Sequence, residues 1–231
     1  RHNVNVDLAS GASSFTKGAD GQLYTDTLIN IEGIIGSDNN DVISGNSAAN
    51  KIYGASGDDE IKGGDGDDFI DSGSGNDFVY GENGDDIIEQ SGSGTQHYDG
   101  GPGTDTYSIN TSFLPSHFDA QIEVNLVSGL SGLANDQDNI LNDTLTNFEN
   151  VNFSAAFFEL EIYGDDDSNI LTGGSASDSI NGAEGNDTIQ GGDGRDYLYG
   201  GSGNDVLNGN SGKDYFFGGT GDDTIIFGDE P

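Results

Sequence analysis

Aspartates recur every nine residues along two stretches of the chain, and each of them follows a glycine-rich segment. A representative unit is 63–71, with the sequence GGDGDDFID, in which Asp68 holds the sixth place. Carboxylates and exposed glycine carbonyls form an all-oxygen set of about six ligands, which suits Ca²⁺ better than Mg²⁺ with its small octahedron and retained waters. The chain has no Cys and three His, which argues against zinc or copper. These residues therefore predict calcium ligation.

The candidate ligands are the oxygen-bearing residues at the sixth place of each unit and the carbonyls of the turns before them. Units start at 36, 45, 54, 63, 72, 81, 91 and 100, with Gln90 as one extra residue, and again at 164, 173, 182, 191, 200, 209 and 218. The candidate side-chain ligands are Asp41, Asp59, Asp68, Asp77, Asp86, Asp105, Asp178, Asp187, Asp196, Asp205, Asp214, Asp223 and, as a weaker ligand, Asn169. The candidate carbonyls are those of turn residues such as Gly54, Gly63, Gly64, Gly66, Gly81, Gly84, Gly182, Gly185, Gly191, Gly192, Gly194, Gly200, Gly201, Gly203, Gly218, Gly219 and Gly221.

The same period predicts the elements that position these ligands. Glycines at the first, second and fourth places favour positive φ and exposed carbonyls. A strand of three residues follows, and its central side chain, at the eighth place, is always apolar or Tyr and points inward. Two units close a coil of 18 residues, and the coils stack at about 4.8 Å. The predicted fold is all-β: a right-handed parallel β-solenoid, flattened into a β-roll, with almost no helix.

Stacking places sixth-place residues 18 apart in one gap, so Asp59 would face Asp77 and Asp187 would face Asp205. Two carboxylates that share a gap repel each other, and their pKa values rise unless a cation lies between them. This spacing predicts a row of calcium sites along the turns.

The repeated pattern Gly-Gly-x-Gly-x-Asp-x-apolar-x resembles the calcium-binding nonapeptide of the RTX (repeat-in-toxin, haemolysin-type) family. The resemblance implies a parallel β-roll, calcium at the turns, and secretion of the parent protein by a bacterial type I system. It assigns the ligand role to the sixth-place aspartates and to carbonyls of their turns. Gln96 departs from the pattern and puts the pairing of units 72 and 91 in doubt, while Asn50 and Asn169 lack the charge. With these weakened, about eight to ten calcium ions are expected.

The segments outside the repeats are copies of each other. Residues 6–11 match 124–129, and residues 26–32 match 143–149. The chain therefore reads as two modules, with a lead-in at 1–35 before a roll at 36–108, and a lead-in at 109–163 before a roll at 164–226, the second module extending to 231. The lead-ins are expected to continue the solenoid without calcium and to cap each roll; a ligand-binding face is the alternative.

Composition excludes several classes of protein. The chain has 231 residues and a formal net charge of −36, which argues against binding to nucleic acid or to an anionic membrane. No apolar run is long enough to insert in a membrane. The sequence starts at Arg1 without an export signal, and both ends look cut from a longer chain. So acidic a chain needs cations in order to fold.

No catalytic pattern is present, and the protein is expected not to be an enzyme. The three histidines, His2, His97 and His117, stand apart from carboxylate or serine partners, and no nucleophile elbow, zinc-protease or phosphate-loop motif occurs. Carboxylate pairs repeat in every coil, which favours metal ligation over glycoside hydrolysis.

One outward feature predicts a partner. Tyr197, Tyr199, Tyr215 and Phe217 would form an aromatic patch on one sheet face of the second roll. Docking of a protein, such as an adjoining domain or another copy, or capping is favoured over a surface glycan. The function predicted is a secreted, calcium-binding structural region of a bacterial surface adhesin, surface layer or extracellular matrix protein. The alternative is the carboxy-terminal module of a secreted protease, lipase or polysaccharide epimerase.

Overall fold

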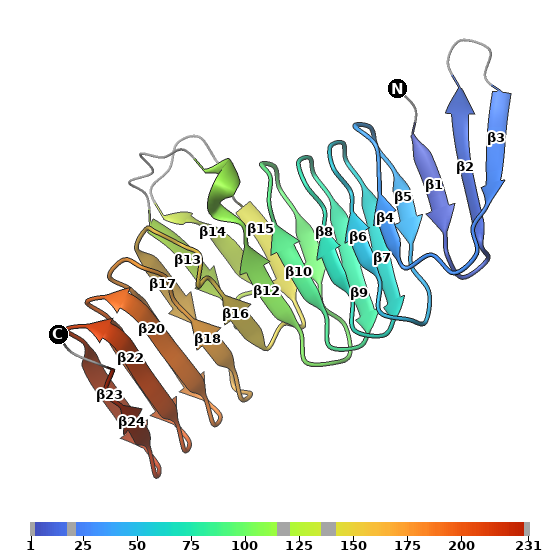
Figure 1. The fold of residues 1–231 in the computed structure, drawn as a ribbon. Coiled ribbons are helices and arrows are strands. Elements are labelled where there is room, and N and C mark those ends of the chain that lie inside the picture. Colours follow the sequence, from blue (N-terminus) through green and yellow to red (C-terminus); the bar gives the residue numbers. More distant parts are fainter. Residues whose placement is uncertain (1–2, 18–21, 115–120, 135–141, 229–231) are drawn as a thin grey trace. The chain divides into compact units, whose positions relative to one another are not determined.

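The computed structural model describes residues 3–17, 22–114, 121–134 and 142–228. Most of their strands are parallel and stacked as coils, and the only helical element among these residues is a short 3₁₀ turn, η2 (Thr111–Phe113). Figure 1 shows the strands of successive coils lying side by side. The structure confirms the predicted β-solenoid. No described helix is long and apolar enough to span a bilayer.

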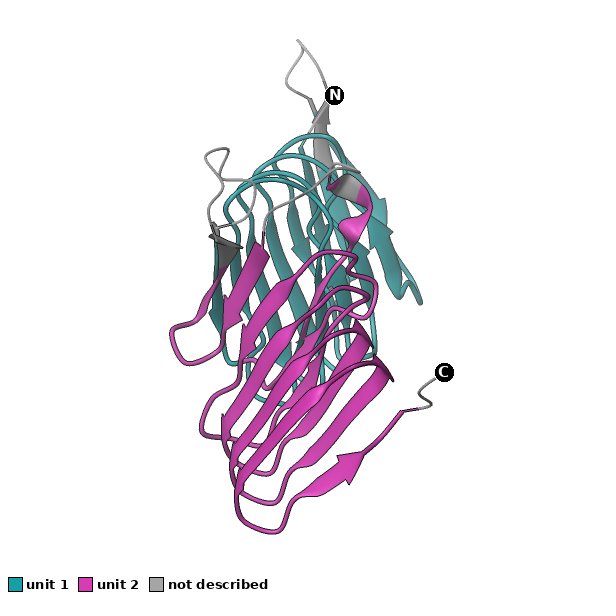
Figure 2. Cartoon of the chain, turned by 90° about the vertical axis from the view of Figure 1, so that its left-hand side faces the viewer, with its two compact units in different colours: residues 1–106, 143–147 teal, residues 107–142, 148–231 magenta. Residues whose placement is uncertain are grey.

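Two compact units divide the chain, one comprising Arg1–Thr106 with Asp143–Asn147 and the other Tyr107–Asn142 with Phe148–Pro231 (Figure 2). The separation of the two predicted modules at 108/109 stays a prediction.

The first unit contains two sheets. One runs in the order β15-β11-β9-β7-β5-β1-β2-β3. The other runs in the order β10-β8-β6-β4, and β12 (Thr106–Ile109) begins at the last residue of the first unit's main segment. The strands of the first sheet are β1 (Val4–Asp7), β2 (Ala12–Lys17), β3 (Gln22–Thr27), β5 (Val42–Ser44), β7 (Glu60–Asp65), β9 (Phe78–Asn83), β11 (His97–Asp99) and β15 (Asn142–Thr146). Those of the second are β4 (Gly33–Ile35), β6 (Lys51–Tyr53), β8 (Phe69–Asp71) and β10 (Ile87–Gln90).

The second unit repeats this construction. One sheet runs in the order β23-β21-β19-β17-β13-β14, and the other in the order β24-β22-β20-β18-β16. The first contains β13 (Gln121–Asn125), β14 (Leu130–Ala134), β17 (Leu160–Tyr163), β19 (Ser179–Glu184), β21 (Tyr197–Ser202) and β23 (Tyr215–Thr220). The second contains β16 (Asn150–Asn152), β18 (Ile170–Thr172), β20 (Thr188–Gly194), β22 (Val206–Gly212) and β24 (Thr224–Ile226).

The core is a column of eighth-place side chains. Residues 18 apart pair directly, as Ile52 does with Ile70 and Leu171 with Ile189, and all four are fully buried. Because each strand contributes one inward side chain, stacking is the only way to bury it, and adjacent coils depend on each other.

The extra residue Gln90 does not disturb the stack. Strand β11 pairs in parallel with β9, with Tyr98 beside Val79, so the doubt about units 72 and 91 was wrong. The buried Gln90 side chain accepts a hydrogen bond from the Tyr98 hydroxyl and donates one to the Gly92 carbonyl. The inserted amide is therefore satisfied inside the coil.

The lead-ins follow the solenoid only in part. Ile34 pairs with Ile52, and Ile162 with Ile180, in the eighth-place register that the sequence predicts. Strands β2 and β3 are instead antiparallel to their neighbours, and so is β14 to β13. The expectation that the whole lead-in continues the parallel coil was therefore wrong, because these segments are too irregular to follow the nine-residue period.

Candidate metal centre

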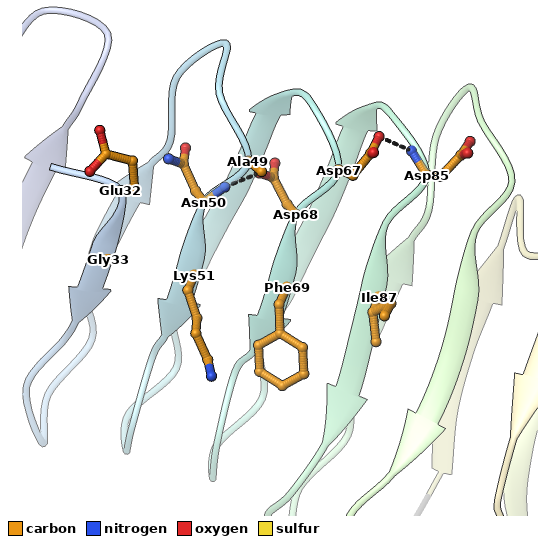
Figure 3. Close-up of a pocket in the computed structure, with 10 residues that line it drawn as sticks. All are labelled: Glu32, Gly33, Ala49, Asn50, Lys51, Asp67, Asp68, Phe69, Asp85 and Ile87. Carbon is orange, nitrogen blue, oxygen red and sulfur yellow. Dashed lines mark hydrogen bonds between the residues drawn. The ribbon is translucent and has the colours of Figure 1, made fainter. Parts of the chain in front are cut away.

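A ladder of hydrogen bonds joins the sixth-place residues of successive coils. The backbone N–H of Asp59 donates to Oδ1 of Asp77 at 2.9 Å, and that of Asp187 donates to Oδ1 of Asp205 at 2.9 Å. Figure 3 shows the same bond between Asn50 and Asp68. One oxygen of each carboxylate is thus held by the backbone of the coil before it. Further ladder pairs are 41/59, 68/86, 86/105, 169/187, 178/196, 196/214 and 205/223.

The second carboxylate oxygen, Oδ2, has no hydrogen-bond donor in many of these aspartates. Within the described part of the chain, the Oδ2 atoms of several sixth-place aspartates are buried and have no hydrogen-bond partner. A buried carboxylate oxygen without a donor is costly unless a cation replaces the lost water. In the first unit they include Asp59, Asp68, Asp77 and Asp86, and in the second unit they include Asp187, Asp196 and Asp205.

Burial also raises the pKa of these carboxyls. Desolvation is the main cause, the neighbouring carboxylates add to it, and the backbone N–H donor of the ladder opposes it. The pKa rises from 3.8 to about 7 for Asp59, Asp68 and Asp196. It rises to about 6 for Asp187. A calcium-free roll therefore disfavours the charged carboxylates that a cation would stabilise.

Asp77 and Asp178 differ in their hydrogen bonding. Burial raises the pKa of both carboxyls to about 6, but a hydrogen bond from the Ser72 side chain lowers that of Asp77, and one from the Gly174 backbone N–H lowers that of Asp178. The Gly174 N–H thus satisfies Oδ2 of Asp178 without a metal, whereas Oδ2 of Asp77 has no hydrogen-bond partner.

The first-place glycines leave room beside the unpaired oxygens. A Cβ added at Gly63 would overlap Asp68 Oδ2 and would lie 2.6 Å from the carbonyl oxygen of Gly81, one coil on. The same holds at Gly182, with Asp187 Oδ2 and the Gly200 carbonyl. An orphaned carboxylate oxygen and a carbonyl from the next coil therefore converge on one small space.

This convergence corrects one expectation from the sequence. Positive φ occurs at the second and fourth places, as at Gly64 (116°) and Gly66 (98°), but not at first-place glycines such as Gly63. The first place requires glycine because the carboxylate and carbonyl approach the backbone closely, rather than because of an unusual φ. Even a non-glycine residue at the second place, Ala183, adopts a φ of 78°.

The arrangement fits a hard cation held mainly by carbonyls. No three Asp, Glu or His side chains come together as a metal cluster among the residues that the structure describes. Carboxylates would thus supply a minority of the ligands, and turn carbonyls the rest, as Ca²⁺ accepts readily.

The first turns of each roll are closed by the protein itself. Oδ2 of Asp41 accepts from the Ser37 N–H at 2.5 Å, and Oδ2 of Asp178 accepts from the Gly174 N–H at 2.8 Å. Oδ1 of Asn50 and of Asn169 accept the corresponding N–H of their own turns at 2.8 Å and 2.9 Å. These four side chains have their acceptor satisfied and have less need of a metal.

Sequence reasoning missed Asp143, which belongs to the ladder. The Gln96 side chain keeps the ladder intact by accepting from the Asp77 N–H at 2.7 Å, and the Gln96 N–H donates at 2.9 Å to Asp143. Asp143 belongs to the second lead-in and is fully buried. Its match to Asp26 in the duplication was visible, but the partner 47 residues away was not.

The remaining residues that the sequence singled out are two aspartates and four aromatic residues near the end of the second roll, and the three histidines. Asp214 and Asp223 accept ladder bonds but are only half-buried. Tyr197 stacks on Tyr215 at 4.8 Å, and Tyr199 on Phe217 at 4.6 Å, measured between ring centroids. His97 stacks on Phe78 at 4.9 Å. His2 and His117 lie outside the described residues.

A cavity of about 450 Å³ adjoins the ladder on β6 and β8 (Figure 3). Its walls include Asp68 and the pair Lys51 and Phe69, with the Lys51 amine 5.2 Å from the Phe69 ring centroid. The Lys51 ammonium group therefore lies over the Phe69 ring, beside the acidic turns.

Comparison with known proteins identifies the repeats. The model of the RTX calcium-binding nonapeptide repeat matches four stretches, at residues 35–70, 53–88, 163–198 and 190–225, which together span just over half of the chain. A search of curated proteins found no match.

Proposed function

The chain belongs to the RTX calcium-binding nonapeptide repeat family, and from this premise we propose that it is a structural region that folds when calcium enters its turns. Its repeats are calcium-binding repeats. We place the ions between coils 18 residues apart, at the sixth-place aspartates and the turn carbonyls, and expect about eight to ten of them.

The observation that carries this proposal is the set of buried, unpaired Oδ2 atoms. Asp68 and Asp187 represent them in the two units, each next to a carbonyl of the following coil. A cation there would offset the desolvation that raises the pKa of both carboxyls. Because the space exists only when coils are stacked, binding energy would become folding energy.

Charge explains why the metal is needed. A net charge of −36 on a chain whose coils bury single apolar side chains opposes compaction. Fixing each residue costs about 1–2 kcal/mol of backbone entropy. Where free calcium is low, as in bacterial cytosol, the chain would stay extended and suited to export; outside the cell it would fold.

We propose that the region is not catalytic and serves in a bacterial surface adhesin, surface layer or extracellular matrix protein. The duplication of lead-in and roll supports this role, because a structural spacer gains length with each copy. The carboxy-terminal module of a secreted enzyme remains the alternative, and catalytic motifs in adjoining sequence would distinguish it.

The test is circular dichroism of the purified chain while calcium rises from zero, set by a chelator, to about 10 mM. We expect a cooperative change from coil to β signal, which magnesium at equal ionic strength does not reproduce. A chelated chain that is already fully β, and that melts no lower than the calcium-loaded chain, would refute calcium-driven folding.

A further inference from the structure

The second lead-in shows how this chain covers the end of a calcium roll. Strand β15 pairs in parallel with β11, placing Thr144 beside His97, Leu145 beside Tyr98 and Thr146 beside Asp99. The buried Leu145 continues the core column. The terminal coil of the roll is thus capped by one strand of a lead-in.

Backbone and side-chain hydrogen bonds define this pairing. The Gln96 N–H donates to Asp143 Oδ1 at 2.9 Å, and the Thr144 N–H donates to the Gln96 carbonyl at 2.9 Å. The Asn147 amide donates to Asp99 Oδ1 at 2.7 Å. An aspartate at the start of the strand and an asparagine after it therefore hold the lead-in on the roll.

The first lead-in carries the same elements. Asp26, Thr27, Leu28 and Asn30 occupy the positions of Asp143, Thr144, Leu145 and Asn147. Asn30 and Asn147 share a φ of 54°.

The hairpins of the two lead-ins also match. Val6 pairs with Ser13 in the first, and Val124 with Ser131 in the second. The preceding turns contain the same bond, from the Ser10 N–H to Asp7 and from the Ser128 N–H to Asn125. The two copies have thus folded alike, and β3 is the counterpart of β15.

In the described part of the chain, however, β3 ends its sheet without a strand on its outer side. Asp26 is exposed whereas Asp143 is buried, and Ile29 is 73 % exposed. An exposed strand edge with apolar side chains is a template for pairing with another strand.

The complementary surface lies at the end of the second roll. Among the described strands, β23 ends its sheet. The unit starting at 209 is the next-to-last of its roll, as the unit starting at 91 is of the first. Asp214 there corresponds to Gln96, and Tyr215, Phe216 and Phe217 correspond to His97, Tyr98 and Asp99.

We infer that β3 of one copy pairs in parallel with β23 of a second copy, head to tail, in the register of β15 on β11. The Asp214 N–H would donate to Asp26, and Phe217 would lie beside Ile29. The template pairs polar Asp99 with Thr146, whereas both members of the inferred pair are apolar and exposed. This matched change of character on two surfaces far apart in the sequence identifies the second copy as the occupant.

Such a contact joins two different surfaces, so it does not close on itself and would yield linear assemblies. It requires a stacked terminal coil, and therefore it rests on the proposed calcium-driven folding. It also gives the aromatic patch of β21 and β23 a role, since the rows of Tyr197 with Tyr215 and Tyr199 with Phe217 would run on to the next copy.

The test is sedimentation velocity of the 231-residue chain in calcium, over about 1 to 100 μM protein, with circular dichroism of the same samples. We expect the chain to assemble in a concentration-dependent manner. Ile29→Lys and Phe217→Lys should each remain monomeric and fully β. The matched controls are Val127→Lys, 70 % exposed, and Phe78→Lys, 48 % exposed, which should assemble like the unaltered chain.

Mixing separates this arrangement from any other. Each blocked variant keeps one intact surface, so an equal mixture of Ile29→Lys and Phe217→Lys should form dimers and nothing longer. A monomeric unaltered chain that is fully β in calcium would overturn the inference, and so would a mixture that stays monomeric. A chain that shows neither β signal nor assembly in calcium would instead refute the proposed folding by calcium.

Discussion

Asp67 and Asp68 are adjacent carboxylates that should respond differently to the same substitution. Asp68 is buried, with Oδ2 unpaired, and its Oδ1 accepts the ladder bond from the Asn50 N–H. Asp67 is exposed and accepts from the Asp85 N–H at 3.1 Å (Figure 3). Changing either to Asn removes one negative charge, so net charge is matched and only the site differs.

Asp68→Asn should weaken calcium binding in the gap between the coils of Gly63 and Gly81. Loss of even an outer partner of a bound metal costs about 10- to 100-fold in affinity, or about 1.4–2.7 kcal/mol, and a direct ligand should cost at least as much. The amide is compatible with the fold, because Asn50 and Asn169 occupy the same place in other coils. We therefore expect a folded chain that binds about one ion fewer.

Isothermal titration calorimetry of the two variants measures this difference, with circular dichroism reporting the calcium midpoint for folding. Asp67→Asn should bind as many ions as the unaltered chain. Equal effects of both substitutions would mean that calcium acts only through net charge, and the ligand role of the sixth place would be wrong.

Three further predictions concern pH, packing and the first-place glycines. The pKa of Asp59, Asp68 and Asp196 is raised from 3.8 to about 7 in the fold, so their contribution to calcium-free stability is fully present below 3.8 and is lost as pH rises through about 7. The chelated chain should thus gain β signal when acidified from about pH 8 to pH 5, while its calcium midpoint rises because protons compete for the carboxylates; a midpoint independent of pH would contradict this. Ile189→Ala, in the buried column between Leu171 and Leu207, should lower the free energy of unfolding in calcium by about 2–5 kcal/mol in urea titrations, and an equal loss in the half-buried control Gln190→Ala would argue against the column. Gly182→Ala should abolish binding at its turn in the same calorimetric assay because the new Cβ would overlap Asp187 Oδ2, whereas Gly33→Ala, whose nearest neighbour would be the Lys51 carbonyl at 3.9 Å, should bind normally; unchanged binding by Gly182→Ala would place the ion elsewhere.

Much of the solenoid could be predicted from the sequence, because its determinants are local and repeated. A nine-residue period gives each coil its turns and its single inward side chain, so the pairing of Ile52 with Ile70 followed from spacing alone. The predicted gaps between aspartates 18 apart also correspond to pairs that the ladder joins, as at Asp59 and Asp77.

Spacing does not determine what each oxygen contacts. Oδ1 of Asp77 is held by the backbone of another coil, and the space beside Gly63 appears only when a carboxylate and a carbonyl converge on it. These contacts depend on side-chain direction and close approach between coils, which a one-dimensional pattern does not contain.

The lead-ins contain both features that are readable in the amino-acid order and features that depend on the folded chain. The duplication showed that Asp26 and Asp143 correspond, because aligning the two copies of the sequence is sufficient to pair them. It did not show that β2 and β3 run antiparallel, or that Asp143 receives the N–H of Gln96 from 47 residues away. Inside the rolls each coil positions the next, so the period is sufficient; where the period stops, pairing is set by which strand edge remains open, and only the folded chain determines that.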